Sequence, residues 1–129
     1  MRFLALSLIF LIPNTNAFGA EPFETYGKCF ALYVKACDYG CWDEDGNAIP
    51  SAARLAQTHV EKASVMLGYA RNSSRYLSGL DAFDAGSEFG ATAGNEEERM
   101  AVLSALDGKP RAEEYRLSKI DSLKCDYLR

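Results

Sequence analysis

Apolar and aromatic residues recur at helical spacing along most of the chain. The first stripe, within residues 23–39, repeats every 3.6 residues and predicts a helix. Its members are Phe23, Tyr26, Cys29, Phe30, Tyr33, Val34 and Cys37. Further stripes predict a long helix over residues 51–79, bent near Gly68, and helices over residues 95–108 and 111–128. No stretch alternates strictly as a strand does, so the pattern predicts an all-α fold, a small bundle of four helices.

The connections between these helices are marked by turn-forming residues. Residues 81–94 are rich in Gly, Ala, Asp and Ser and predict a loop, in which we expect Phe83 and Phe89 to turn inward. Asn95 then caps the next helix. After the first helix, the dipeptide Asp45-Gly46 predicts a tight turn.

The N-terminus has the pattern of a secretory signal. One basic residue precedes an unbroken apolar run over residues 3–12, which Pro13 ends. Small residues allow cleavage after Ala17, and a site after Gly19 fits nearly as well. The run is about half the length that spans a bilayer, so we expect no membrane anchor. Residues 1–17 are therefore predicted to be a signal peptide, residues 18–129 a single helical domain, and the mature protein periplasmic or secreted.

The four cysteines are best explained as structural disulfides. An exported domain of this size meets an oxidising compartment, where cysteines form disulfides that reinforce a modest core. Zinc sites and redox centres favour Cys-x-x-Cys spacing, which this chain lacks, and His59 is the sole histidine. We therefore expect no metal.

Helical geometry limits which cysteines can pair. In one helix, Cys29 and Cys37 lie about 12 Å apart along the axis, whereas a disulfide needs Cα atoms within about 7 Å. Gly40 can end the helix and let Cys37 reach Cys41, which leaves Cys29 for Cys125. This pairing is preferred. The other allowed choice is Cys37 with Cys125, with Cys29 and Cys41 free, and either choice ties the first helix to the last.

The motifs that could form a metal or catalytic site are each better explained by a structural role. The acidic turn at residues 43–46 resembles part of a calcium-binding loop. Aligning Gly46 with the glycine of such a loop puts Cys41 at the first ligand position and Ala52 at the last, where an acidic side chain is required, so the segment does not match a calcium site. His59 lies on the apolar stripe of the long helix without a second histidine, which favours a packed side chain. We expect no enzymatic activity and no cofactor.

Charge favours a protein partner. The chain carries a formal net charge of −4, which repels nucleic acid and anionic lipid surfaces. It favours a basic protein through association rate and specificity. Enzymes that act on the anionic cell wall commonly have basic surfaces, so an acidic, disulfide-linked exported domain fits an inhibitor of such an enzyme. The sequence is also compatible with a homodimer.

Two short stretches resemble a known family. Tyr26 and Cys37 in YGKCFALYVKACDY, and the segment 123–127 in SLKCDYL, are similar to the early and late helices of periplasmic immunity proteins that neutralise type VI secretion peptidoglycan amidases. This resemblance implies binding to a toxin amidase and occlusion of its cleft. It covers only the two ends of the domain, and two of the cysteines are extra to it.

Two segments combine acids with aromatics and are the predicted contact surface for a basic cleft. They contain Trp42, Asp43, Glu44 and Asp45 in residues 42–47, and Asp81, Phe83, Asp84 and Phe89 in residues 81–89. The alternative for their aromatic rings is that they cover the ends of the bundle. Two other functions stay open: a lysozyme inhibitor or envelope-stress binding protein, and a carrier of a small apolar ligand.

Overall fold

The computed structural model describes residues 21–128, which form four α-helices and a short 3₁₀ helix. In chain order these are α1 (Glu21–Val34), α2 (Pro50–Ser74), α3 (Gly79–Asp107), α4 (Lys109–Ser122) and η3 (Cys125–Tyr127). In this part of the chain the only strand-like pairing is one isolated antiparallel bridge. The all-α prediction is confirmed, whereas the predicted signal peptide lies outside the described residues.

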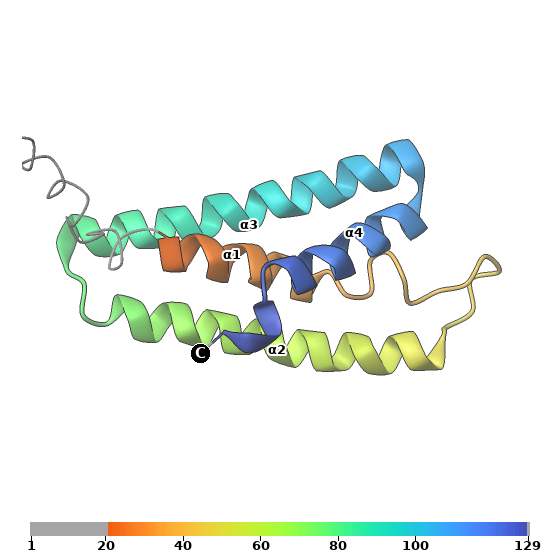
Figure 1. The fold of residues 1–129 in the computed structure, drawn as a ribbon, viewed down its shortest axis with the longest axis horizontal. Helices are drawn as coiled ribbons and strands as arrows, with labels where there is room; N and C mark the ends of the chain where they lie inside the picture. Colours follow the sequence, from red (N-terminus) through yellow and green to blue (C-terminus); the bar gives the residue numbers. More distant parts are fainter. Residues whose placement is uncertain (1–20, 129) are drawn as a thin grey trace, which may run out of the picture.

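Helix α1 lies at the centre of the bundle. It runs between α2 and α3, and α4 packs beside its C-terminal part (Figure 1). α2 and α3 touch each other little, because α1 separates them over most of their length. The apolar stripe of α1 therefore faces neighbours on several sides, and Ala31, Leu32 and Tyr33 are fully buried.

The main core surrounds the C-terminal half of α1. It combines side chains from all four helices and η3, namely Cys29, Leu32, Tyr33, Ala63, Met66, Met100, Ile120 and Cys125. Burying a side chain of the size of Leu32 contributes about 1.5–3 kcal/mol. A smaller core of Phe23, Ala70 and Ala85 joins α1, α2 and α3 at the other end.

α1 and α3 approach each other closely at Gly27. A Cβ atom at this position would overlap the Oγ1 atom of Thr92 and the carbonyl oxygen of Phe89, and would lie 3.2 Å from the carbonyl carbon of Phe89. Only glycine therefore fits here, because the obstructing carbonyl belongs to the backbone of α3.

Two disulfides link the chain. Cys29 pairs with Cys125, with 5.7 Å between Cα atoms and a sequence separation of 96 residues. Cys37 pairs with Cys41, with 4.9 Å between Cα atoms. We call the first the core disulfide and the second the loop disulfide; these are the pairs that helical geometry favoured. With no free cysteine among the described residues, they indicate an oxidising compartment.

The predicted loop at residues 81–94 is wrong, because this segment is the first half of α3. Its glycines lower helix propensity by about 1 kcal/mol each relative to alanine. Burial outweighs that cost, since Ala85, Thr92 and Ala93 are buried and Phe89 packs against the smaller core. Asn95 is accordingly in mid-helix and caps nothing.

The ends of three helices also differ from the prediction. α1 stops at Val34, and the chain turns so that Ala36 and Cys41 pack on Ala56 of α2. α2 begins at Pro50 and ends at Ser74, before the predicted 79. α4 ends at Ser122, and Lys124 adopts a left-handed conformation with φ of 57° before η3. This break turns Cys125 back towards α1.

Candidate functional site

The segment between α1 and α2 forms an ordered loop at one end of the bundle (Figure 1). Trp42 and Ala48 form the antiparallel bridge, and the N–H of Asp43 donates to the carbonyl of Asn47 over 2.9 Å. The N–H of Gly46 donates back to the carbonyl of Asp43 over 3.1 Å, and φ of 82° at Gly46 closes the turn. The predicted Asp-Gly turn is thus confirmed. We call residues 42–47 the acidic loop.

Asp43 organises the acidic loop from within. Its Oδ1 atom accepts hydrogen bonds from the N–H groups of Asp45, over 2.9 Å, and Asn47, over 2.8 Å. An aspartate that binds backbone N–H groups two and four residues ahead stabilises a turn. This carboxylate is therefore engaged within the loop, whereas those of Glu44 and Asp45 are left facing solvent.

The outer surface of the acidic loop combines one tryptophan ring with three carboxylates. Trp42 is 59% exposed, and Asp43, Glu44 and Asp45 are exposed beside it. Exposed tryptophan is a frequent hot-spot residue in protein interfaces. The alternative that Trp42 covers the end of the bundle is not what the structure shows, since most of its surface faces solvent.

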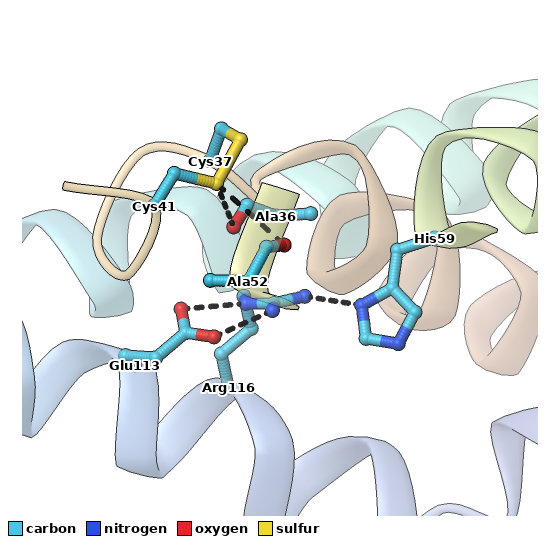
Figure 2. Close-up of a disulfide and its surroundings, with 7 residues drawn as sticks. All are labelled: Ala36, Cys37, Cys41, Ala52, His59, Glu113 and Arg116. Carbon is cyan, nitrogen blue, oxygen red and sulfur yellow. Dashed lines mark hydrogen bonds and ion pairs between the residues drawn. A yellow bond between two sulfur atoms is a disulfide. The ribbon is translucent and has the colours of Figure 1, made fainter. Parts of the chain in front are cut away.

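The loop disulfide holds the base of the acidic loop. Cys41 is buried, and its Sγ atom lies 3.7 Å from the carbonyl oxygen of Ala36 and 4.0 Å from that of Ala52 (Figure 2). A disulfide sulfur has no proton to donate, so these are packing contacts. Cys37, in contrast, is exposed. The base of the loop is thus anchored on α2 on one side and open to solvent on the other.

Beneath this base lies a buried polar cluster centred on Arg116 of α4, which is 1% exposed (Figure 2). Its Nε and Nη2 atoms donate to the two carboxylate oxygens of Glu113 over 2.9 and 2.6 Å. Its Nη1 atom donates to the carbonyl oxygen of Leu32 over 3.0 Å and lies 2.9 Å from Nδ1 of His59. Arginine only donates, so Nδ1 of His59 is the acceptor and its proton is on Nε2.

Burial, with the nearby positive charge of Arg116, lowers the pKa of His59 to about 4. His59 is therefore neutral at pH 7 and buried between α1, α2 and α4, in ring contact with Tyr33 at 5.2 Å. Glu113 also faces the loop, since a Cβ at Gly40 would lie 2.8 Å from its Cγ and Cδ atoms. This cluster supports the turn from which the acidic loop starts.

A second polar cluster joins the C-terminal segment to α1 and α2. Asp126 accepts a hydrogen bond from the hydroxyl of Tyr33 and one from Nζ of Lys62 over 2.8 Å. The hydrogen bond from Lys62, with that from Tyr33, lowers the pKa of Asp126. Burial and Asp126 raise the pKa of Tyr33. Together with the core disulfide, this cluster fixes η3 on the bundle.

The second predicted contact segment lies elsewhere. Asp81, Phe83 and Asp84 are exposed in the first turns of α3, at the opposite end of the bundle from the acidic loop (Figure 1). Phe89 turns inward, where its ring packs 5.5 Å from that of Phe30. The 25 residues of α2 separate the two ends by about 37 Å. One narrow cleft cannot engage both segments.

Sequence reasoning missed two features of these sites. Arg116 is on the buried face of α4 with Ala112 and Ile120. Its spacing of four residues from each was the signal that could have identified it. Tyr76 and Leu80 are large and strongly exposed, and precede Phe83 in the same segment. The polar residues around them indicated a turn, but the spacing of residues does not show whether a side chain in a turn is exposed.

Within residues 21–128, no group of three His, Cys, Asp or Glu side chains is placed to hold a metal ion. No helix there is long and apolar enough to cross a membrane. A surface cleft of about 660 Å³ lies between the start of α1 and the end of α2, lined by Phe23, Tyr26 and Tyr76 among others.

Comparisons with protein-family models, curated proteins and solved structures found no match to this chain.

Proposed function

We propose that this chain is an exported, non-enzymatic binding protein that inhibits a basic cell-wall-degrading enzyme by placing the acidic loop in its active cleft. The observation that carries the proposal is this ordered, projecting loop, with Trp42 at its surface and carboxylates beside it. A peptidoglycan amidase is the target that the resemblance of the two cysteine-containing segments implies.

The order of the acidic loop supports tight binding. A flexible loop loses conformational entropy when a partner immobilises it, which weakens association. Here the turn is held by hydrogen bonds of Asp43, by the Trp42–Ala48 bridge and by the loop disulfide at its base. These constraints are present before binding, so more of the contact energy goes into affinity.

The charge of the loop supports a basic partner. Asp43, Glu44 and Asp45 are consecutive, exposed and without a basic side chain in an ion pair with them among the described residues. A cleft that binds the anionic cell wall provides the complementary field, which steers association and selects the partner.

The predicted signal peptide and the two disulfides support a periplasmic or secreted location, where the target would be met.

The experiment is capture with the mature, oxidised chain as bait, using envelope and secreted fractions, followed by an assay of peptidoglycan hydrolysis by the retained protein. Trp42→Ala is expected to weaken binding to that hydrolase by at least about 2 kcal/mol, roughly 30-fold in Kd. The double variant Glu44→Lys/Asp45→Lys is expected to slow association, most clearly at low salt. Asp43 is left unchanged because it organises the turn.

A matched control changes the charge by the same amount on the helices. Glu61→Lys/Glu98→Lys alters two exposed acids of α2 and α3 and should leave association nearly unchanged. If binding responds equally to both double variants, net charge rather than the acidic loop attracts the partner. If Asp81→Lys/Asp84→Lys alone abolishes binding, the contact is at the opposite end of the bundle.

The alternative functions give different results in the same experiment. Retention of a lysozyme, or of an envelope protein without hydrolase activity, would indicate the stress-binding alternative. The carrier alternative is supported by the cleft between α1 and α2, whose volume is within the usual range for ligand pockets. Native mass spectrometry of the purified chain would detect a retained small molecule if the chain is a carrier.

A further inference from the structure

Three large apolar side chains are exposed along the segment where α2 connects to α3. Tyr76 is 88% exposed, Leu80 78% and Phe83 69%, all within eight residues of sequence. We call them the α2–α3 patch. Leu80 and Phe83 are three residues apart and share one face of α3. The patch is at the opposite end of the bundle from the acidic loop (Figure 1).

The area of the α2–α3 patch is large for a monomer of this size. At 150–250 Å² for a whole aromatic side chain, Tyr76 and Phe83 together expose on the order of 300 Å². With Leu80, the patch reaches the size of the largest apolar patch on a typical monomer, which commonly marks an interaction site. Two such patches facing each other, with the charged residues beside them, approach the total of about 1,200 Å² found in small stable interfaces.

The charges around the patch identify its partner. Arg71 and Arg75 lie on the α2 side, and Asp81 and Asp84 lie on the α3 side, all exposed. Within residues 21–128, none of the four takes part in an ion pair. A partner surface of one sign would be repelled by half of this border. A surface that carries both signs in reverse order fits it.

A second copy of the same chain has that surface. In a two-fold interface, residue i of one copy contacts residue j of the other and the reverse. When the axis passes between the α2 side and the α3 side of the border, the basic side of each copy faces the acidic side of the other. We propose that the chain forms a two-fold homodimer through the α2–α3 patch. Both acidic loops then lie at the far ends of the dimer and stay accessible, so dimerisation and target binding use separate surfaces.

Sedimentation equilibrium of the mature, oxidised chain from micromolar to millimolar concentration tests this directly. We expect a reversible monomer–dimer equilibrium. Leu80→Asp should raise the dimer dissociation constant by at least about tenfold, because it places a charge in the apolar centre. Leu106→Asp, an equally large change at an exposed site near the other end of α3, should alter it by about twofold or less. Circular dichroism checks that both variants remain folded.

Charge exchange tests the two-fold arrangement itself. Arg75→Asp should weaken the dimer by about fivefold, and combining it with Asp81→Arg should restore most of the loss, since each variant contact then has its opposite charge again. Lys109→Asp, which changes net charge by the same amount on α4, is the control.

A chain that stays monomeric throughout, or a dimer that Leu106→Asp disrupts as much as Leu80→Asp, would overturn the proposal. If the chain is monomeric but Leu80→Asp abolishes capture of the target, the patch belongs to the target interface instead. Failure to capture a target with an intact dimer would count only against the inhibitor proposal.

Discussion

Gly27 allows a sharp test of how α1 and α3 pack. In the middle of an exposed helix, replacing glycine by alanine stabilises the protein by about 1 kcal/mol. At Gly27 the added methyl group would overlap Thr92 Oγ1 and the carbonyl oxygen of Phe89. The threonine can move, but the carbonyl cannot without moving α3, so α1 and α3 must separate. Overpacking of this kind costs about 1–3 kcal/mol, and we expect Gly27→Ala to lower the free energy of unfolding by about 2 kcal/mol.

Gly90 on α3 is the matched control. It is exposed, has helical geometry, and a Cβ there would meet no atom within 4 Å. Gly90→Ala should therefore stabilise the protein by about 0.5–1 kcal/mol. The two variants have the same chemical change and opposite expected signs, so effects of alanine on the unfolded chain cancel in the comparison.

Urea unfolding followed by circular dichroism, with both disulfides oxidised, measures the difference. We expect about 3 kcal/mol between the two variants, with unchanged slopes. Adding Thr92→Ala to Gly27→Ala should recover only part of the loss, because the backbone carbonyl remains in the way. If Gly27→Ala is as stable as Gly90→Ala, the close approach of α1 to α3 is not as described.

Three further predictions concern the buried groups and the disulfides. The pKa of His59 is lowered to about 4 in the folded state from an ordinary 6.5, so as the pH falls the unfolded chain binds this proton first. The free energy of unfolding should therefore decrease between pH 6.5 and pH 4. In urea unfolding, His59→Gln should lose less stability over this pH range than the unsubstituted chain, by up to about 3 kcal/mol. Arg116→Met should cost about 3 kcal/mol in thermal or urea unfolding, whereas Arg111→Met, at an exposed ion pair, should cost less than about 1 kcal/mol. Limited reduction should open the loop disulfide before the core disulfide, as detected by alkylation and mass spectrometry. Permanent loss of the core disulfide should lower the free energy of unfolding by up to about 5 kcal/mol, and loss of the loop disulfide by about 2 kcal/mol. Simultaneous opening of both would contradict the difference in burial.

Helical spacing predicted the fold class and favoured the two disulfide pairs that form, while it left the pairing of Cys37 with Cys125 open. The stripes in α1 and α2 are long and periodic. The pairing argument placed Cys29 and Cys37 in one helix, whereas α1 ends at Val34, so the preferred pairs formed although this premise was wrong. The Asp45-Gly46 turn was also predictable, because its turn chemistry is local.

Features that depend on tertiary packing were not predictable. The first half of α3 reads as a loop by composition, and only its burial against α1 through Ala85 and Thr92 makes it helical. Of the two predicted contact segments, the acidic loop has the expected exposure. The other is divided by helix geometry, with Phe83 outside and Phe89 inside, because residues six apart fall on different faces of a helix.

The central place of α1 has a consequence for how the molecule is made. A chain is synthesised from its N-terminus, so among the four described helices the central one emerges first and waits longest for its neighbours. Cys29, Cys37 and Cys41 become available together while Cys125, 96 residues after Cys29, is still to come. During this interval an oxidant can join the early cysteines wrongly. Cys37 lies beyond the end of α1 at Val34, so formation of this helix does not by itself keep Cys29 and Cys37 apart. Correct maturation therefore depends on the turn after α1 bringing Cys37 to Cys41 early, or on an isomerase that exchanges a wrong bond afterwards.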